Sequence, residues 1–183
     1  MVVTPGVSPT EVLESKRLVF RPQQMSDLES FCAMEQDVEV RRYVGGAPRT
    51  REDAEKRFKA GKNHWEDLLG LRAVILKSDG VYIGRAGLYP HFGPQGPVAG
   101  EASISYYLAR EYWGQGFATE AGAFFVKRGF GVLGLSRIVT TIDARHEASR
   151  RVLEKLGFQL YETEAGSRVF QKYELLHGHG PLV

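Results

Sequence analysis

Two glycines, Gly114 and Gly116, mark the segment of this 183-residue chain whose residue types most clearly suggest chemistry. Residues 101–109 before them read as a strand, and Phe117-Ala-Thr119 after them begins a helical pattern. The first turn of a helix has free backbone N–H groups and the positive end of the helix dipole, so it attracts anions such as phosphate. The spacing predicts a phosphate-bearing ligand at 114–119, unless the glycines only permit a tight turn.

Other phosphate and nucleophile motifs do not fit. A dinucleotide fingerprint would need a third glycine where Thr119 stands, and no nucleotide-triphosphate loop is present. The run 129–134 matches G-x-G-x-x-G, but a predicted helix precedes it and a predicted strand follows, so we interpret it as a helix end. The chain has no Gly-x-Ser-x-Gly elbow, which leaves an acyl-serine mechanism without support.

Polar residues also open a later helix, predicted over 147–156. Ser149 there could cap free N–H groups or take part in chemistry, and both interpretations stay open. The single cysteine, Cys32, lies among apolar residues at helical spacing and is predicted to be a core thiol. His177 and His179 lie in a short tail without acidic or thiol partners, so no metal site is predicted.

Composition limits the class of protein. The chain is 43% hydrophobic and 25% charged with a net charge of +2, which is typical of a globular protein and lacks the basic cluster of a nucleic-acid binder. We see no signal peptide and no apolar run near the ~20 residues of a membrane span, so we expect no membrane partner. One cysteine allows no internal disulfide, and together these features suggest a cytoplasmic protein. We expect a flexible arm over 1–15, one domain over 16–176 and a tail over 177–183.

The periodicity predicts an α/β chain in the order β-α-α-β-β-β-α-β-α-β-β. Ser26 and Glu29 have the spacing of a capping box before a first helix, and Thr50 begins a second helix that extends to Leu69. Residues 91–100 carry glycine and proline and are predicted to be a loop. The predicted strands are 17–21, 71–77, 81–89, 101–109, 137–143, 158–163 and 168–176, and the later helices are 117–129 and 147–156.

Three segments together resemble the GNAT acetyltransferases, in particular the RimJ/RimL-type branch. They are Arg17-Leu-Val-Phe-Arg-Pro22, the run from Tyr106-Tyr-Leu to Tyr112-Trp-Gly-Gln-Gly-Phe-Ala-Thr-Glu-Ala121, and His146-Glu-Ala-Ser-Arg-Arg-Val-Leu-Glu-Lys-Leu-Gly-Phe158. The resemblance covers about residues 15–175. It implies the GNAT fold, with a mixed, mostly antiparallel central sheet of about seven strands flanked by about four helices.

The resemblance also implies an acetyl-CoA site. The CoA pyrophosphate would lie on the N–H groups of 114–119, and the pantetheine arm would pair with the strand at 105–108 like an added strand. A main-chain N–H near Tyr107 would bind the thioester oxygen. His146 stands where the family often has an asparagine that contacts the pantetheine. The cofactor-binding residues implied in this way are Tyr106, Tyr107, Leu108, Trp113, Gly114, Gln115, Gly116, Phe117, Ala118, Thr119, His146 and Ser149.

The catalytic residues implied by the resemblance are Glu101 and Ser149. Glu101 matches a catalytic glutamate of several GNAT branches and would take a proton from the amine, although it could also be a solvated strand-end charge. His91, Glu162 and Glu164 could also face the acceptor and stay open as alternatives to Glu101 as the base. Many GNAT enzymes have a tyrosine as general acid where this chain has Leu153, so Ser149 becomes the candidate proton donor to the CoA thiolate. The acetyl group would pass directly to a primary amine, either on a small molecule or at a protein N-terminus.

Two other functions compete with this interpretation. One is a non-catalytic acyl-CoA-binding or sensory module on the same fold, and a weaker one is a nucleotide-binding oxidoreductase. Dimers are common in the branch, so a homodimer is one of the open oligomeric states, and no nucleic-acid partner is expected. The residues do not identify the acceptor, which the loops at 41–48 and 91–100 and the turn near 164–167 would shape.

Overall fold

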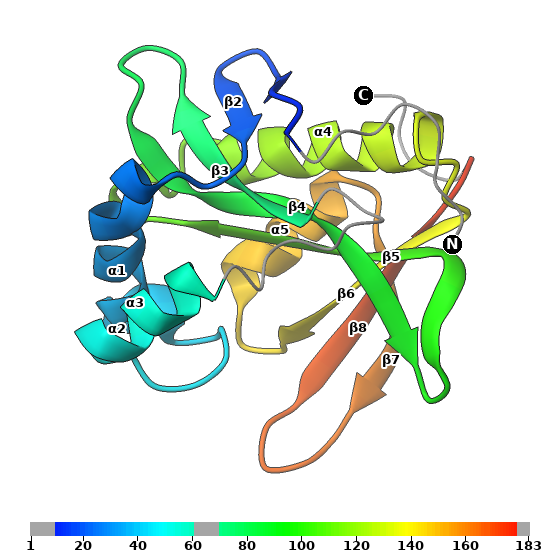
Figure 1. Cartoon of the computed structure of the whole chain (residues 1–183). Coiled ribbons are helices and arrows are strands. Elements are labelled where there is room, and N and C mark those ends of the chain that lie inside the picture. The colour runs from blue at the N-terminus through cyan, green and yellow to red at the C-terminus, as the bar shows by residue number, and fades with distance from the viewer. Residues whose placement is uncertain (1–9, 61–69, 179–183) are drawn as a thin grey trace.

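The computed structural model describes residues 10–60 and 70–178 of the chain (Figure 1). Two short 3-10 helices, Met25–Asp27 and Arg110–Tyr112, accompany the main elements. The helices are α1 (Leu28–Gln36), α2 (Val38–Arg41), α3 (Arg51–Lys59), α4 (Phe117–Gly131) and α5 (Glu147–Lys155). The strands are β1 (Leu13–Glu14), β2 (Leu18–Arg21), β3 (Gly70–Leu76), β4 (Tyr82–Gly93), β5 (Gly96–Leu108), β6 (Arg137–Asp143), β7 (Gln159–Glu164) and β8 (Phe170–Leu176).

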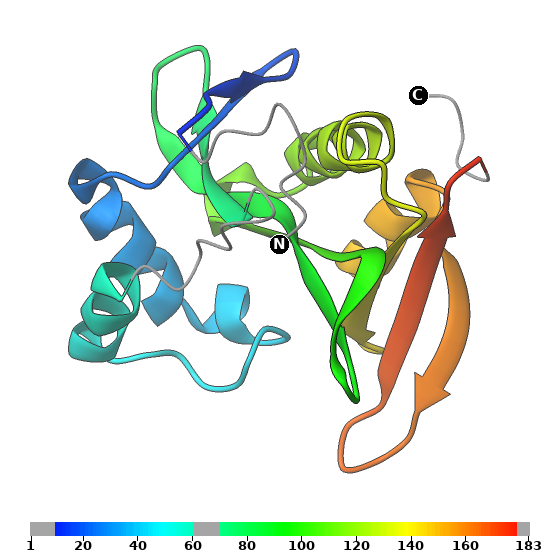
Figure 2. The ribbon, with the colours of Figure 1, turned by 45° about the vertical axis from the view of Figure 1, so that its right-hand side comes forward.

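The strands form one sheet in the order β1-β2-β3-β4-β5-β6-β8-β7. All neighbours are antiparallel except β5 and β6, which are parallel and joined through the crossover helix α4. Figure 2 shows α1, α2 and α3 grouped at one end of the molecule and α4 and α5 at the other. The layered α/β fold with a mostly antiparallel sheet is therefore confirmed, with eight strands and five α-helices among the described residues.

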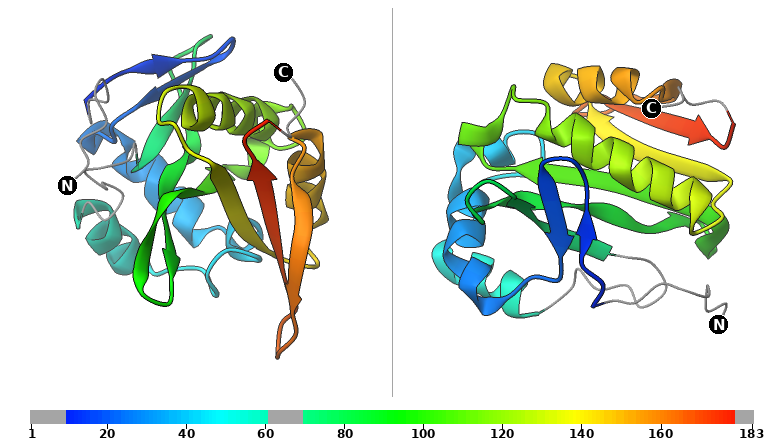
Figure 3. Two further views of the ribbon diagram at one scale, coloured as in Figure 1. Left: turned by 90° about the vertical axis from the view of Figure 1, so that its right-hand side faces the viewer. Right: turned by 90° about the horizontal axis from the view of Figure 1, so that it is seen from above.

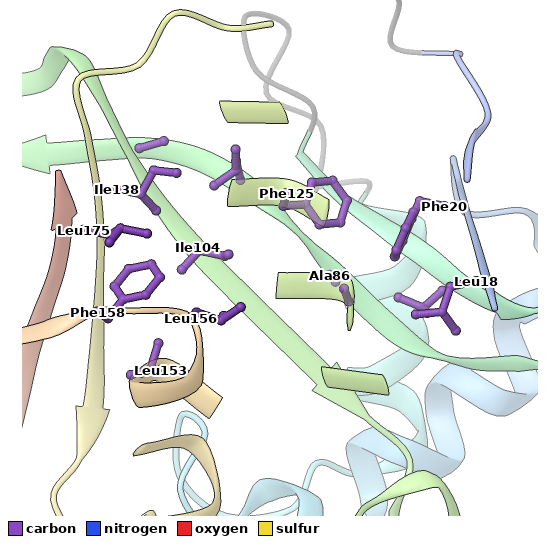
Figure 4. Packing of buried hydrophobic residues seen from close by; sticks show 14 of the residues in the cluster. Leu18, Phe20, Ala86, Ile104, Phe125, Ile138, Leu153, Leu156, Phe158 and Leu175 are labelled. Atoms are coloured by element: carbon purple, nitrogen blue, oxygen red, sulfur yellow. The ribbon is translucent and has the colours of Figure 1, made fainter. Parts of the chain in front are cut away.

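Alternation along the strands produces two hydrophobic cores, one on each face of the sheet. In β2, Leu18 and Phe20 join the larger core beneath α4 and α5, while Val19 packs on the smaller core with α1 and α3. Figure 4 shows the larger core, where Phe125 of α4 and Leu153 of α5 meet side chains of the central strands. Both cores hold the sheet and the two helix groups in a fixed arrangement.

The pairing of β5 with β6 is interrupted part-way along the two strands. Only Glu101–Ser103 of β5 pairs with β6, opposite Arg137–Val139. Beyond Ser103 the two strands diverge, as Figure 1 and the left view of Figure 3 show. The later residues of β5 keep their pairing with β4, and no strand of the described residues pairs with the other edge of Ser105–Leu108. The interruption leaves backbone groups available to a ligand.

Several predicted elements agree with the structure. The hairpin around Ser78–Gly80, the helix after 117, the strand Arg137–Asp143 and the helix after His146 are all present. Thr50 caps α3 as predicted, because its Oγ1 accepts from the Asp53 N–H at 3.1 Å. Cys32 is fully buried, and burial raises the pKa of its thiol.

Other expectations are corrected. Within the predicted arm, Leu13–Glu14 forms β1 against β2 because the Leu13 side chain is buried in the larger core. Ser26 is not a helix cap: a 3-10 turn comes first, and Asp27 accepts the Gln24 N–H at 2.8 Å. The predicted loop 91–100 is largely strand, since β4 and β5 continue to Gly93 and from Gly96 and pair there. The short helix α2 was not predicted.

Some expectations fall outside the described residues. The second helix ends at Lys59, and the predicted helical positions Gly61, Trp65 and Leu69 lie outside the described ranges, as does the part of the predicted tail after Gly178. Of the helices that the structure describes, none combines the length and the apolar character needed to cross a bilayer.

Candidate acetyl-transfer site

The glycine turn has the geometry of an anion site. Gly114 and Gly116 have φ angles of 73° and 82°, in the left-handed region where glycine is favoured. Gly116 is the N-cap of α4 and has no side chain that could occupy the first N–H groups of the helix. A Cβ built on Gly114 would meet no atom of the described chain within 4 Å. Backbone N–H groups of α4 are therefore open to a ligand at its positive end.

Arg17, at the start of β2, fixes this turn from the other side. Its Nη1 donates to the Gln115 carbonyl at 3.0 Å, and its guanidinium carbon lies 4.3 Å from the centre of the Phe117 ring. Its Nε and backbone N–H both donate to the Glu120 carboxylate, at 2.6 and 2.7 Å. This pairing lowers the pKa of Glu120, although burial opposes the shift. Arg17 thus links the N-terminal strand to the anion turn.

A cavity of about 420 Å³ begins at this turn and runs between β5, α4 and α5. Most of the predicted cofactor-binding residues line it. Gln115 does not, because its side chain turns outward and donates to the Glu111 carbonyl at 2.8 Å. Trp113 is held in place by a 2.7 Å bond from its indole N–H to the Leu108 carbonyl. The predicted residues on the cavity wall are Tyr106, Tyr107, Leu108, Trp113, Gly114, Gly116, Phe117, Ala118, Thr119, His146 and Ser149.

A second cavity of about 660 Å³ lies on the other side of the divergence between β5 and β6. Tyr89, His91, Ser103 and Ser105 form part of its wall, and β6, β7 and β8 contribute the opposite wall. The two cavities share five lining residues, Val44, Tyr106, Tyr107, His146 and Ser149. We name these five the junction. A ligand in each cavity could meet the other there.

Ser149 and Tyr106 form a hydroxyl pair at the junction. Their oxygens lie 3.1 Å apart, and the Tyr106 hydroxyl also donates to the Ser149 carbonyl at 3.4 Å. Burial raises the pKa of Tyr106 to about 12, so this phenol keeps its proton at neutral pH. Ser149 is buried inside the first turn of α5, with its hydroxyl at the phenol. The pair can therefore supply a proton or a hydrogen bond.

The second catalytic candidate, Glu101, lies apart from the junction and borders neither cavity. Its carboxylate pairs with Arg137 Nη1 at 3.2 Å and lies 3.9 Å from His91 Nε2. Arg137 is also bound by Glu174 at 2.7 Å. Any contact between Glu101 and a ligand in the second cavity would run through His91.

A buried ion cluster positions the loop that brings Val44 to the junction. The Glu35 carboxylate accepts from Arg85 at 2.7 Å and from Arg49 at 2.9 Å, and Arg41 Nη1 lies 3.3 Å away. Arg41 in turn donates to the Gly45 carbonyl at 2.9 Å. Glu35, Arg41 and Arg85 are nearly inaccessible to solvent. The loop after α2 is thereby attached to α1 and to β4.

Comparison with known proteins identifies the family. Residues 17–159 match the Acetyltransferase (GNAT) domain. The chain belongs to the GNAT acetyltransferase family. It is 33% identical over 150 residues to the uncharacterized N-acetyltransferase YoaA of Bacillus subtilis, covering 81% of this chain and 82% of that one. It is 30% identical over 151 residues to the uncharacterized N-acetyltransferase p20 of Bacillus licheniformis, covering 81% and 83%. This GNAT enzyme is accordingly an acetyl-CoA-dependent N-acetyltransferase.

Solved structures agree on the fold. A GNAT-family acetyltransferase from Bacillus anthracis superposes with a TM-score of 0.78 at 23% identity, covering 91% of this chain and 98% of that one. Spermidine N-acetyltransferase from Vibrio cholerae, solved with CoA and spermine, gives a TM-score of 0.74 at 16% identity, covering 90% and 98%. The arrangement of sheet and helices is thus that of GNAT enzymes.

Sequence reasoning missed the contacts of three residues of the site. Arg17 was placed in a predicted strand and in the first segment of the resemblance, and Tyr43 and Val44 lie in the loop 41–48, which was expected only to shape the acceptor side. Arg17 acts on residues 98 and more positions away, and no local pattern encodes such a contact. Tyr43 stacks on His146, with ring centres 4.6 Å apart, and an aromatic residue in a predicted loop was the available signal.

Proposed function

We propose that this protein is a RimJ/RimL-type N-acetyltransferase that moves an acetyl group directly from acetyl-CoA to a primary amine, on a small molecule or at a protein N-terminus. One observation carries the proposal: two cavities, one starting at an anion turn, meet where β5 and β6 diverge. Such a meeting point lets a thioester and an amine approach each other at the junction, so no acyl-enzyme is needed.

In this proposal the first cavity holds the donor. The CoA pyrophosphate binds the N–H groups of 114–119 at the positive end of α4. The pantetheine arm lies along Ser105–Leu108, whose open edge offers backbone groups, and His146 provides a polar contact to it. The thioester oxygen accepts a main-chain N–H near Tyr107, which stabilises the negative charge that develops there.

The reaction requires two proton movements. The ammonium form of the acceptor first loses a proton to a base, because only the free amine can attack the thioester carbon. The C–N bond forms, the C–S bond breaks, and the CoA thiolate receives a proton or hydrogen bond from Ser149, which the Tyr106 hydroxyl supports. The base expected from the resemblance is Glu101, and in this structure Glu101 would reach an amine in the second cavity through His91, which lies 3.9 Å away.

The charges of the second cavity favour an acceptor with a single amine. Asp143 is neutralised by Arg145, which donates to both of its oxygens at 2.9 and 2.7 Å. Lys172 Nζ lies 2.8 Å from Glu162. A polyamine would need carboxylates that are not already paired with a cation. Both carboxylates that line this cavity, Asp143 and Glu162, already pair with a cationic side chain. An acceptor with one ammonium group and an uncharged body fits better.

The proposal also covers the assembly and the location of the enzyme. We propose one catalytic domain over 16–176, cytoplasmic and dimeric. Every residue of the edge strand β7 is exposed, including Leu160 and Tyr161, and an exposed strand with apolar side chains supports pairing with a second copy. Light scattering after size-exclusion chromatography tests the dimer, and a mass of one chain would reject it.

Thiol release from acetyl-CoA tests the function. The panel contains peptides with free N-termini, small aromatic and aliphatic monoamines, and spermidine. Release above the hydrolysis rate is expected with a monoamine or a peptide, and mass spectrometry should show the acetylated amine. If CoA binds in calorimetry yet no amine accelerates release, the protein is a non-catalytic acyl-CoA-binding module instead.

A further inference from the structure

We propose that His146 is the general base of this enzyme, and this inference rests on the proposed function. Its imidazole would take the proton from the incoming ammonium group directly at the junction. Neither the sequence pattern nor the family resemblance gave this role to His146, which was expected only to contact the cofactor.

The first support is position. A base must lie within hydrogen-bond reach of the amine nitrogen, or one water away. His146 lines both cavities, whereas His91 lines only the second and Glu101 lines neither. Its backbone is fixed on both sides, since its N–H donates to the Asp143 carbonyl at 2.8 Å and its carbonyl accepts from Arg150 at 3.1 Å. The imidazole therefore stands in a defined place beside both ligands.

The second support is that no side chain of the described residues bonds the ring nitrogens. His146 occupies the N-cap of α5, but its side chain makes no capping hydrogen bond. Among residues 10–60 and 70–178 no other side chain bonds its ring nitrogens, and its contact is the stacked Tyr43 ring at 4.6 Å and 24°. Stacking orients the imidazole and leaves both nitrogens available. A nitrogen facing the junction can accept a proton.

The third support is electrostatic. Burial lowers the pKa of His146, and the nearby Asp143 only partly opposes this. The ring is thus neutral at pH 7 and can accept a proton. Asp143 is itself paired with Arg145. The other titratable or charged groups that line the two cavities are Tyr43 on the loop after α2, Tyr89 and His91 on β4, Tyr106 and Tyr107 on β5, Tyr112 in the 3-10 helix after β5, Tyr161, Glu162 and Lys172 on the outer strands, and Arg151 and Lys155 on α5.

The step balances as follows. The ammonium group gives one proton to His146 and becomes the free amine. The amine attacks the thioester carbon, the C–N bond forms, and the C–S bond breaks as the oxyanion collapses. Ser149 and Tyr106 pass a proton to the thiolate, and the second proton of the nitrogen replaces it on this hydroxyl pair. The imidazolium returns its proton to solvent, so one proton is released for each acetyl group transferred.

Two substitutions separate proton transfer from the other contacts of the side chain. His146→Asn retains a polar group for the cofactor, and His146→Phe retains a ring for stacking on Tyr43, but neither accepts a proton. Glu154→Gln is the matched control, because Glu154 lies on the exposed side of α5 and, within the described part of the chain, pairs only with Arg150. Glu101→Gln is compared as the competing base. Circular dichroism and CoA affinity by calorimetry show whether each variant is folded and binds the donor.

The expected result is a loss of kcat of about 100-fold or more in both His146 variants, since general bases contribute about 10²–10⁴. CoA affinity should change much less in these variants. The acid limb that wild type shows in the pH profile of kcat should be absent from both of them. In wild type, NMR titration of the His146 ring should give the same midpoint as that limb. Glu154→Gln should match wild type, and Glu101→Gln should lose less than His146→Asn.

The inference is overturned if wild type acetylates an amine and His146→Asn keeps kcat within about threefold with an unchanged acid limb. A larger loss in Glu101→Gln than in His146→Asn would overturn it as well. If wild type releases no thiol with any amine while CoA still binds, the proposed function itself fails, which is a different outcome from either of these.

Discussion

Replacing Gly116 by alanine tests whether the anion turn holds the pyrophosphate. Gly116 has a φ of 82°, so an alanine there is held in the left-handed region, and its Cβ would lie 3.4 Å from Arg17 Nη2. Gly134, after the other end of α4, has a φ of 65° and open space around its Cβ position. Gly134→Ala is therefore a control with the same backbone strain at a place outside both cavities.

The magnitude has two parts. Left-handed backbone costs an alanine about 1–2 kcal/mol, and a domain of this size loses about 2–4 °C of Tm per kcal/mol, so both variants should melt about 2–8 °C lower. In Gly116→Ala the new methyl group also disturbs at least one N–H contact to phosphate. A hydrogen bond to a charged group contributes about 1.5–3 kcal/mol, which corresponds to about 10- to 150-fold in Kd for CoA.

Calorimetry with CoA and thermal melts of both variants give the answer. Both should lose a similar amount of Tm, and only Gly116→Ala should lose CoA affinity. If Gly116→Ala binds CoA as well as wild type, the turn does not hold the pyrophosphate. If Gly134→Ala weakens binding equally, the loss comes from strain in α4 and not from the site.

Three further predictions concern other parts of the molecule. Glu35→Gln should lower the free energy of unfolding in urea by about 3–5 kcal/mol, because the buried charges of Arg41 and Arg85 lose this carboxylate. The control Glu39→Gln, whose partner Arg42 is exposed, should lower it by less than about 1 kcal/mol. Equal losses would contradict the role of the cluster. Ser149→Ala should lower kcat about 100-fold with little change in KM for acetyl-CoA, and steady-state kinetics with unchanged kcat would exclude Ser149 as donor. Because burial lowers the pKa of His146 in the folded state, the unfolded chain binds more protons than the folded chain just below the ordinary histidine pKa. The free energy of unfolding should therefore fall as the pH drops through this range. Chemical unfolding at several pH values should show a smaller fall for His146→Asn than for wild type.

Much of the fold could be predicted because its signals are local. Alternation of polar and apolar residues predicted the strand at Arg17–Arg21, which overlaps β2, the glycine turn predicted the start of α4, and Thr50 predicted the start of α3. The errors in the predicted elements lie where long-range contacts determine the secondary structure. Leu13 joins a strand because it reaches the core, and the segment after His91 stays extended because β5 pairs with it across a tight turn.

The candidate site likewise has a part that depends on local sequence and a part that depends on long-range contacts. The anion turn is contiguous in sequence, so its residues could be named from spacing and resemblance. The junction is assembled from the loop after α2, from β5 and from α5, and no spacing predicts that His146 would stack on Tyr43. Likewise the ion pair with Arg137, which removes Glu101 from both cavities, depends on the register between β5 and β6.

The short pairing between β5 and β6, which we call the seam, should make the rate of degradation of this protein depend on its substrate. Three residue pairs join the two parts of the sheet, and a cofactor arm lying along Ser105–Leu108 would fill the open stretch beside them. A ligand that binds only the folded state at 100 times its Kd adds about 2.7 kcal/mol of stability. Opening of the seam, and with it degradation by cellular proteases, should therefore slow when acetyl-CoA is abundant and quicken when it is scarce.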